Sequence, residues 1–374
     1  MKIVFLSNFY NHHQAYISRK LHELTNGNYK FICATALENS RKELGYPEFD
    51  DEFVILFDGK DQTIQSIIDS ADVVICGSAP EAWIKNRKKQ KKLIFRYSER
   101  PLKNGLSWWK YPYRFYKFHK KNPPKVPIYM LCASAYTSVD YAKFGLFKGK
   151  CFKWGYFPEC NQYENIKALI SGKIKNEILW CGRFLDWKHP CDVLEIAKKL
   201  KADGKYFHIT MIGIGEMEAE LKEMESRYEL SEYITFLGSV STQKVREYME
   251  KASIYLFTSD RKEGWGAVLN EAMNSACAVV ASDAAGSTPY LVKSGENGIV
   301  YPSGDIEALY KAVAQLLDSA EMQSELGIKA YETIINEWNA DNAAVRFVCL
   351  AEKIISGEKK LDLYSTGPCS EIKY

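Results

Sequence analysis

The sequence predicts an α/β protein built from two doubly wound, parallel-sheet domains of the Rossmann type. Short apolar segments alternate with helical stretches, and this series runs twice along the 374 residues. Short, continuously apolar strands separated by helices are typical of βαβ units, because helices cover both faces of a parallel sheet. The length is also ample for two domains of ordinary size.

The first series contains six expected strands and several helices. A helix is expected from about Ala15 to Leu24, and another before the fourth strand. The expected strands cover residues 2–6, 29–34, 54–57, 71–76, 93–97 and 128–133.

The second series follows a polar, weakly patterned pause at residues 158–177. Its expected strands are residues 178–181, 207–212, 234–236, 254–258 and 278–282, with helices at 191–201, 217–228, 242–251 and 267–275. A helical tail is expected over about 332–357, and residues 361–374 are expected to be loosely held. The expected domains are therefore 1–165 and 166–335, followed by a C-terminal helix and tail at 336–374.

Cysteine usage and hydropathy indicate a cytoplasmic protein. The ten cysteines include no C-x-x-C pair, and several lie in apolar runs, which favours reduced core residues over a disulfide framework or a zinc site. The apolar start turns polar at Ser7, too early for a signal peptide. No apolar run approaches the roughly 18 residues of a membrane-spanning helix. We expect a soluble chain that at most lies on the inner face of a membrane.

One loop and the helix that follows it carry the most informative chemistry. Gly264 and Gly266 would let the backbone approach a ligand closely between a strand and a helix. The free N–H groups at the start of that helix would favour an anion such as a diphosphate. Glu263 precedes the helix and Glu271 lies inside it, eight residues later, or about 12 Å along a helix.

Two carboxylates at that separation can accept hydrogen bonds from sugar hydroxyls at the two ends of a diphosphate-centred ligand. The alternative is structural. Glu271 lies away from the apolar face of its helix, so periodicity alone indicates an ordinary solvated glutamate. Glu263 can equally be a partner of the helix dipole.

A second cluster follows the expected strand 178–181. Arg183 and Lys188 would stand at the carboxyl edge of the sheet, where an anionic ligand binds, although two basic residues in a loop are more often surface charge. Gly213 and Gly215 follow the next strand, but this short glycine pattern does not indicate a dinucleotide site.

In this order and spacing, the clusters resemble the family-four retaining glycosyltransferases, which have two Rossmann-like domains facing a cleft, the type B architecture. The resemblance covers about residues 178–305. It rests on Gly182-Arg183 with Lys188, Gly213-x-Gly215-Glu216, Phe236-Leu237-Gly238, Glu263-x7-Glu271, Val279–Ser282, Gly295–Gly298 and Pro302–Asp305. Ala276-Cys277-Ala278 departs from the family's frequent Gly-x-Pro.

The resemblance implies a role for each matching position. Arg183 and Lys188 would bind the donor diphosphate and stabilise the charge that grows on the leaving group. Glu271 would bind the ribose, and Glu263 the transferred sugar. The backbone at Gly264 and at Gly266, Ala267 and Val268 would hold phosphate, and the stretch from Leu237 to Val240 would lie against the base.

The implied reaction moves a sugar, with retention of configuration, from a nucleotide-diphosphate sugar to a glycan or polyprenyl-diphosphate-linked acceptor in bacterial surface polysaccharide synthesis. No Asp-x-Asp metal signature is present, and we expect no metal and no cofactor. The alternatives are an epimerase or phosphorylase of the same architecture, or a non-catalytic nucleotide- or membrane-binding partner. The C-terminal helix would pack back on the N-terminal domain.

The acceptor side is expected in the first domain. The loop Asn11-His12-His13-Gln14 resembles the start of some bacterial surface-polysaccharide glycosyltransferases. His12 or His13 is a candidate to orient the acceptor or contact the donor phosphate, and His13 is also a candidate general base. The alternative is a polar cluster that caps a helix. Glu99 and Arg100 stand where the family usually has a histidine, and are candidate contacts for the donor sugar or acceptor.

Residues 85–125 hold fifteen Lys or Arg and one acid, a net charge of +14. Within this segment, Trp108, Tyr111, Phe115 and Phe118 follow helical spacing, and a helix expected at about 111–121 would be aromatic on one side and basic on another. Such a helix can lie on an anionic membrane surface. Nucleic acid also suits this composition but no recognised motif accompanies it, so none is expected. A solvated lysine-rich face over core aromatics remains the structural alternative.

Overall fold

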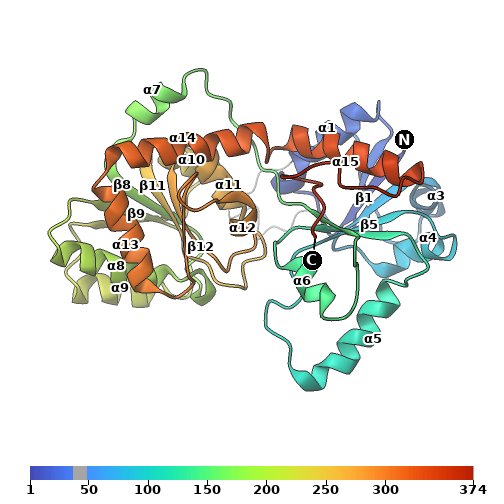
Figure 1. Cartoon of the computed structure of the whole chain (residues 1–374), viewed down its shortest axis with the longest axis horizontal. Coiled ribbons are helices and arrows are strands. Elements are labelled where there is room, and N and C mark those ends of the chain that lie inside the picture. Colours follow the sequence, from blue (N-terminus) through green and yellow to red (C-terminus); the bar gives the residue numbers. More distant parts are fainter. Residues whose placement is uncertain (37–48, 374) are drawn as a thin grey trace. The chain divides into compact units, whose positions relative to one another are not determined.

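The computed structural model describes residues 1–36 and 49–373. Contacts between residues divide the chain into two compact units. Unit 1 comprises Met1–Pro158 together with Trp338–Tyr374, and unit 2 comprises Glu159–Glu337. Each unit contains its own parallel sheet with helices on both faces, as Figure 1 shows. The fold class predicted from the alternating pattern is confirmed.

The sheet of unit 1 has seven strands in the order β3-β2-β1-β4-β5-β6-β7, and every neighbouring pair is parallel. The strands are β1 (Ile3–Ser7), β2 (Tyr29–Cys33), β3 (Val54–Leu56), β4 (Val73–Cys76), β5 (Ile94–Ser98), β6 (Ile128–Cys132) and β7 (Cys151–Lys153). The helices are α1 (His12–Leu24), α3 (Gln62–Ser70), α4 (Lys85–Lys89), α5 (Tyr111–Lys121), α6 (Thr137–Ala142) and α15 (Ala340–Ile355), with short 3-10 turns η1 (Glu81–Ile84) and η2 (Trp108–Lys110).

A buried cation stabilises one edge of this unit. Arg87 of α4 is fully buried, and its guanidinium donates hydrogen bonds to the carbonyls of Ile68 (3.0 Å), Ala71 (2.6 Å) and Leu93 (2.8 Å). These carbonyls come from the end of α3, the turn into β4 and the start of β5. Burial lowers the pKa of Arg87 to about 10, so its charge persists at neutral pH while it satisfies the carbonyls.

The C-terminal segment completes unit 1. Helix α15 packs on α1, and Phe347 contacts Phe95 with ring centroids 5.0 Å apart. The tail then runs beside β7: the N–H of Cys369 donates to the carbonyl of Lys153 (2.8 Å). Glu371 forms an antiparallel bridge with Phe152. The expectation of a loosely held tail is therefore wrong here, because backbone hydrogen bonds attach it to the sheet edge.

The single helix expected over 332–357 is also wrong. Helix α14 ends at Asn336 and α15 begins at Ala340. Asn339 separates them, because its side chain accepts a hydrogen bond from the N–H of Asn342 and so caps α15. The break coincides with the boundary of unit 2 after Glu337.

The sheet of unit 2 has six parallel strands in the order β10-β9-β8-β11-β12-β13. They are β8 (Ile174–Cys181), β9 (His208–Ile212), β10 (Ile234–Gly238), β11 (Ala252–Phe257), β12 (Ala278–Ser282) and β13 (Ile299–Tyr301). The helices are α7 (Ile166–Ser171), α8 (Pro190–Ala202), α9 (Glu218–Arg227), α10 (Thr242–Lys251), α11 (Ala267–Asn274), α12 (Thr288–Leu291), α13 (Ile306–Leu317) and α14 (Ala320–Asn336), with a 3-10 turn η3 (Asp186–Lys188).

The strand order places the site of unit 2. Strand β8 is the first strand of unit 2, and β9 and β11 flank it on opposite sides, so the order reverses between β8 and β11. In open α/β sheets this reversal leaves a crevice at the carboxyl ends of the two strands, where ligands bind. The loops that follow β8 and β11 carry the predicted donor-site residues.

Candidate functional site in unit 2

Side-chain and backbone hydrogen bonds join the loops after β8 and β11. The hydroxyl of Thr258 donates to the carbonyl of Lys188 (2.6 Å) and accepts from the indole N–H of Trp180 (2.9 Å). The N–H of Asp260 donates to the carbonyl of Trp187 (2.9 Å). These hydrogen bonds therefore hold two loops from distant parts of the sequence against each other at the reversal point.

The glycines after β9 have a packing role. A Cβ on Gly213 would lie 1.9 Å from the carbonyl oxygen of Gly182, and one on Gly215 would lie 2.4 Å from that of Phe184. The N–H of Phe184 in turn donates to the carbonyl of Ile214 (2.9 Å). Only glycine permits this contact, which fixes the start of the loop that carries Arg183 and Lys188.

Lys188 and Glu263 form an ion pair between the two loops. Their side chains are only 14% and 11% exposed, so the charges interact in a partly desolvated setting. The hydroxyl of Ser259 also donates to the same carboxylate oxygen of Glu263 (3.2 Å). The structure thus brings together one residue expected to bind the diphosphate, Lys188, and one expected to bind the transferred sugar, Glu263.

Arg183 lies five residues before Lys188 on the same loop and is exposed. Within the described residues, its guanidinium makes no hydrogen bond or ion pair. It therefore remains available to a phosphate group, with a planar set of donors suited to phosphate oxygens.

The N-terminus of α11 lies against this ion pair. Gly266 precedes the helix with φ +84°, and a Cβ there would lie 2.3 Å from the Phe257 ring and 3.2 Å from Cγ of Glu263. In the part of the chain that the structure describes, the N–H groups of Ala267 and Val268 donate to no protein acceptor. Two open donors and the positive end of the helix dipole therefore lie beside Lys188 and Glu263.

The loop before α11 is rigidly packed. Gly264 is buried, and the next residue, Trp265, is fully buried with its indole N–H donating to the side-chain oxygen of Asn270 (2.8 Å). Since Asn270 lies on α11 itself, this bond fixes the loop against the helix that it precedes.

Glu271 lies in the second turn of α11 and is half-buried, so it is not the solvated glutamate that periodicity alone indicated. Burial raises its pKa, and the positive charge of Arg246 partly opposes that rise. Burial also raises the pKa of the Cys181 thiol to about 12, with a further contribution from the Glu271 carboxylate. Glu271 therefore lies near the carboxyl end of β8, where Cys181 ends the strand.

Leu237 and Val240 lie at the carboxyl end of β10, at the edge of the sheet, and both are half-buried. Gly238 between them accepts the N–H of Gly213 on its carbonyl (2.8 Å). Hydrogen bonds thus connect the ends of β10, β9 and β8 in sequence, which provides a continuous edge leading from Lys188 toward these apolar side chains.

Candidate acceptor-side residues in unit 1

Helix α1 begins at His12, three residues before the expected start, so His12, His13 and Gln14 lie in its first turn rather than in a loop. The side chain of Asn11 accepts a hydrogen bond from the N–H of His13 (2.9 Å), as an N-cap does. The helix-capping alternative is therefore correct for Asn11, while the two imidazoles lie together with ring centroids 3.9 Å apart.

A residue that the sequence reasoning missed joins two of the candidates. The ring of Tyr156 stacks on His13, with centroids 5.2 Å apart and an interplanar angle of 14°. Its hydroxyl donates to a carboxylate oxygen of Glu99 (2.6 Å), and Lys103 forms an ion pair with the other oxygen. Tyr156 is half-buried and follows β7 in a segment without secondary structure, so no sequence pattern indicated it.

Arg100 has different partners from Glu99. Its guanidinium contacts both carboxylate oxygens of the buried Asp140 at 3.3 Å and lies 4.7 Å from the Tyr136 ring centroid. Asp140 also accepts the N–H of Leu102 (3.0 Å). These contacts hold the segment after β5 to α6, which gives Arg100 a clear structural role.

No group of three or more His, Cys, Asp or Glu residues with the spacing of a metal site occurs among residues 1–36 and 49–373. None of the helices in this same part of the chain is both long and apolar enough to cross a membrane. None of the ten cysteines, all of which lie in the described ranges, takes part in a disulfide bond.

Comparison with known proteins shows which family unit 2 resembles. Residues 161–333 match the family described as glycosyl transferases group 1. The amylovoran biosynthesis glycosyltransferase AmsK of Erwinia amylovora is 30% identical over 144 residues, which cover 37% of this chain and 35% of that protein. The match thus spans well under half of the length of this curated relative.

Two solved structures have a similar fold over nearly the whole chain. A glycosyltransferase from Rickettsia africae has a TM-score of 0.70 at 14% identity, covering 96% of this chain and 99% of the other. HepE from Anabaena, solved with UDP, has a TM-score of 0.70 at 13% identity, covering 93% and 99%. At these identities the likeness concerns the fold. Residues 161–333 are therefore similar to the glycosyl transferases group 1 family, within a chain that has the two-sheet type B fold of these glycosyltransferase structures.

Proposed function

We propose that this chain is a retaining glycosyltransferase that moves a sugar from a nucleotide-diphosphate sugar to a glycan or lipid-linked acceptor in surface polysaccharide synthesis. One observation carries the proposal. The Lys188–Glu263 ion pair, the available Arg183 and the open N-terminus of α11 meet at the reversal point of a group 1 domain.

The charges at this site suit cleavage of a bond to a diphosphate. As the sugar leaves, negative charge develops on the diphosphate, and Lys188, Arg183 and the N–H groups of Ala267 and Val268 would stabilise it. Loop contacts hold the backbone beside Lys188 and before α11, so only the two cationic side chains would move when the diphosphate binds. The site thus supplies its positive charge from the chain itself, and we propose that no metal is required.

The two glutamates would bind the polar ends of the donor. When phosphate draws Lys188 away, the carboxylate of Glu263 becomes free to accept hydroxyls of the sugar. Glu271 would accept the ribose hydroxyls, since its carboxylate is half-buried and has no hydrogen-bonded partner among the described residues. The apolar side chains of Leu237 and Val240 would contact the base.

We further propose that the acceptor uses unit 1. His13 would act as a base toward the acceptor hydroxyl, and its stacking on Tyr156 and the bond from Tyr156 to Glu99 would orient its ring. The name of the amylovoran relative supports a glycan acceptor, and a polyprenyl-diphosphate carrier would place the enzyme at the inner face of a membrane.

The decisive experiment supplies the purified chain with a panel of UDP-, GDP- and ADP-linked sugars in excess EDTA. We expect one donor to raise the melting temperature and to release its nucleoside diphosphate slowly in water and faster with acceptor. Proton NMR of the product would report the anomeric configuration. Interconversion of donor sugars would indicate an epimerase, phosphate-dependent cleavage a phosphorylase, and binding without any cleavage a non-catalytic module.

A further inference from the structure

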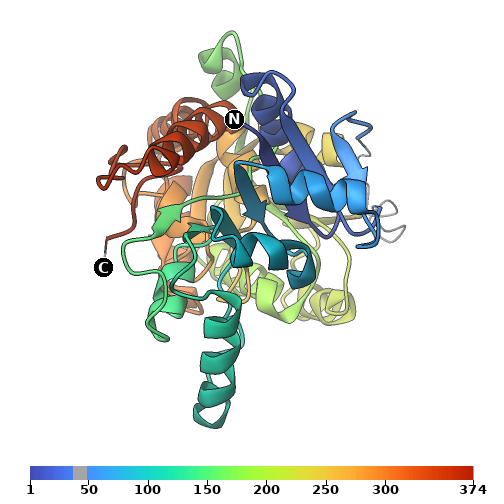
Figure 2. The ribbon, with the colours of Figure 1, turned by 90° about the vertical axis from the view of Figure 1, so that its right-hand side faces the viewer.

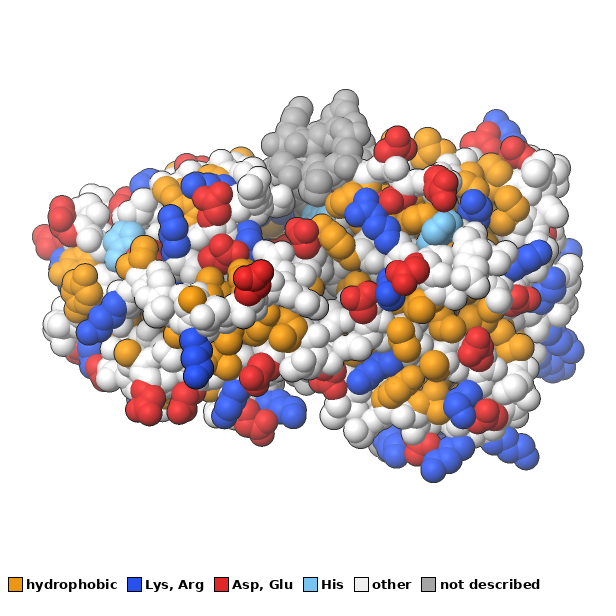
Figure 3. Space-filling view, turned by 90° about the horizontal axis from the view of Figure 1, so that it is seen from above, with side chains coloured by type: hydrophobic (Ala, Val, Ile, Leu, Met, Phe, Trp, Pro, Cys, Tyr) orange, Lys and Arg blue, Asp and Glu red, His pale blue; other side chains and the backbone are white. Residues whose placement is uncertain are grey.

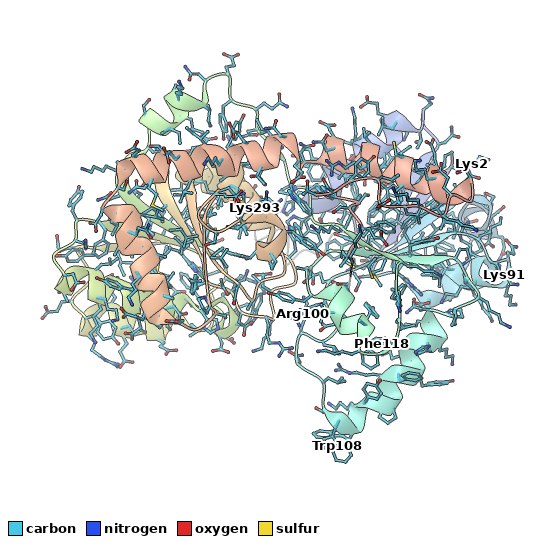
Figure 4. All side chains as sticks on the ribbon, viewed as in Figure 1. Lys2, Lys91, Arg100, Trp108, Phe118 and Lys293 are labelled. Atoms are coloured by element: carbon cyan, nitrogen blue, oxygen red, sulfur yellow. The ribbon has the colours of Figure 1, made fainter. Side chains whose placement is uncertain are left out.

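Helix α5 and the preceding turn η2 project from the rest of unit 1, as Figures 1 and 2 show. Trp108 lies at the far tip of this projection and Phe118 close to its base (Figure 4). We call residues 108–121 the projecting helix. None of its residues is buried.

One face of the projecting helix attaches it to the unit. The Tyr111 ring stacks on Phe144 with centroids 5.1 Å apart, and Phe118 contacts Phe144 at 4.9 Å. The imidazole of His119 hydrogen-bonds the carbonyl of Phe144 (2.9 Å). Two members of the aromatic stripe noted in the sequence thus face inward, and the helix is held in one orientation.

The opposite face carries a second set of aromatic side chains. Trp109, Tyr113 and Tyr116 follow the helical spacing i, i+4, i+7 and are 62%, 64% and 62% exposed. Trp108 at the tip is 83% exposed. Aromatic surface gathered on one ridge and left in water is typical of an interaction site, whereas isolated exposed aromatics are not.

This ridge is accompanied by positive charge alone. The projecting helix contains five Lys or Arg and no Asp or Glu. Lys117 lies 5.7 Å from the Tyr113 ring centroid and Lys120 lies 5.6 Å from that of Tyr116. By contrast, acidic and basic side chains are interspersed over the face of the molecule in Figure 3. The charge on the helix therefore fits an extended anionic surface.

We propose that this ridge docks on an anionic lipid bilayer, with Trp108, Trp109, Tyr113 and Tyr116 entering the headgroup layer. Trp and Tyr rings favour that depth, because one end is apolar and the other forms hydrogen bonds. The lysines pair with lipid phosphates. Single-stranded nucleic acid fits less well, since it binds along basic grooves, whereas this ridge is convex. The role of the ridge in reaching a lipid-linked acceptor rests on the proposed function. The binding of the ridge to lipid does not depend on that function.

The test is flotation of the full chain, without donor, on phosphatidylcholine vesicles with and without phosphatidylglycerol. We expect binding only to the anionic vesicles, with loss at high salt. The variant W109S/Y113S/Y116S and the variant K117A/K120A should each weaken binding at least about tenfold. Tryptophan emission should be quenched by brominated phospholipid in the parent and much less in W108F/W109F.

Matched controls lie on unit 2. Tyr206 is 77% exposed, so Tyr206→Ser removes an equally exposed aromatic, and K311A/K329A removes the same charge as the lysine variant. Both should float like the parent. Because the ridge side chains lie opposite the packed face, circular dichroism and melting temperature should not change.

The inference is overturned if the ridge variants float like the parent, or if neutral vesicles bind equally well. It is also overturned if these variants lose binding to an oligothymidylate while the parent ignores vesicles, since the partner would then be nucleic acid. Donor cleavage is assayed separately without vesicles. Cleavage without vesicle binding refutes this inference alone, and vesicle binding without cleavage refutes only the proposed function.

Discussion

The Lys188–Glu263 ion pair predicts opposite effects of two substitutions on nucleoside diphosphate binding. Without ligand, the ammonium already has a carboxylate partner, so a diphosphate must compete for it. Lys188→Ala removes the cation that phosphate would bind. Glu263→Gln removes the competitor and leaves the cation, with an amide that still accepts the Ser259 hydroxyl.

The magnitudes follow from the burial of the pair. A charge-assisted hydrogen bond contributes about 1.5–3 kcal/mol, so Lys188→Ala should weaken diphosphate binding by roughly 10- to 100-fold. Glu263→Gln should leave that affinity unchanged or strengthen it by up to about tenfold, because the phosphate no longer competes with a carboxylate for Lys188. Stability should fall more in Lys188→Ala, by about 2–3 kcal/mol, because a carboxylate only 11% exposed loses its partner.

The assay is isothermal titration with the nucleoside diphosphate of the donor found in the panel, together with the rate of sugar transfer. Both variants should lose sugar transfer. Glu263→Gln weakens the contact with the transferred sugar, and Lys188→Ala removes the charge that stabilises the leaving diphosphate. The reasoning is refuted if Glu263→Gln weakens nucleoside diphosphate binding as much as Lys188→Ala does. Lys311→Ala is the control, since its exposed ion pair lies on α13.

Four further outcomes are expected. Arg87→Met should cost about 3–5 kcal/mol of unfolding free energy in urea titration, because buried carbonyls lose their donor. Gly213→Ala should lower the melting temperature and abolish nucleotide binding, since its Cβ would meet a carbonyl oxygen at 1.9 Å. Burial raises the pKa of Glu271 in the folded state, so ionisation of its carboxyl group destabilises the fold as the pH rises above the ordinary pKa of 4.5. Glu271→Gln cannot ionise, so paired thermal melts from pH 4 to pH 7 should show the variant becoming more stable than the parent as the pH rises. Tyr156→Phe should lower the rate of sugar transfer by up to about tenfold and leave the donor affinity unchanged. Equal losses of rate and donor affinity would contradict the role of Tyr156 in orienting His13.

The regular parts of the fold were predictable because packing along one face imposes periodicity on the sequence. The bounds of α5, α10 and β12 agree with the sequence expectation residue for residue. Strands β7 and β13, of three residues each, were missed, although the equally short β3 was predicted. The start of α1 was missed because His12 and His13 are polar, although Asn11 is a typical N-cap and could have indicated it.

The loop patterns and the family resemblance indicated the candidate donor-site residues but not their contacts. They could not reveal that Lys188 and Glu263, 75 residues apart, form a pair, since this depends on which strands are neighbours. Periodicity also could not tell the inner from the outer aromatic face of α5, because both have helical spacing. The position of Phe144 decides that Tyr111 and Phe118 face inward. Tyr156 lies in a segment without secondary structure and carries no pattern at all.

The central claim is that the loops after β8 and β11 bind and activate a sugar diphosphate. The most direct measurement is release of nucleoside diphosphate from the matching nucleotide sugar, in EDTA, by the parent and by Arg183→Ala, Lys188→Ala and the Lys311→Ala control. The account predicts release by the parent and the control, and a loss of at least about 100-fold in each site variant. Release at parental rates by either site variant, or none from the parent with any donor, would contradict it.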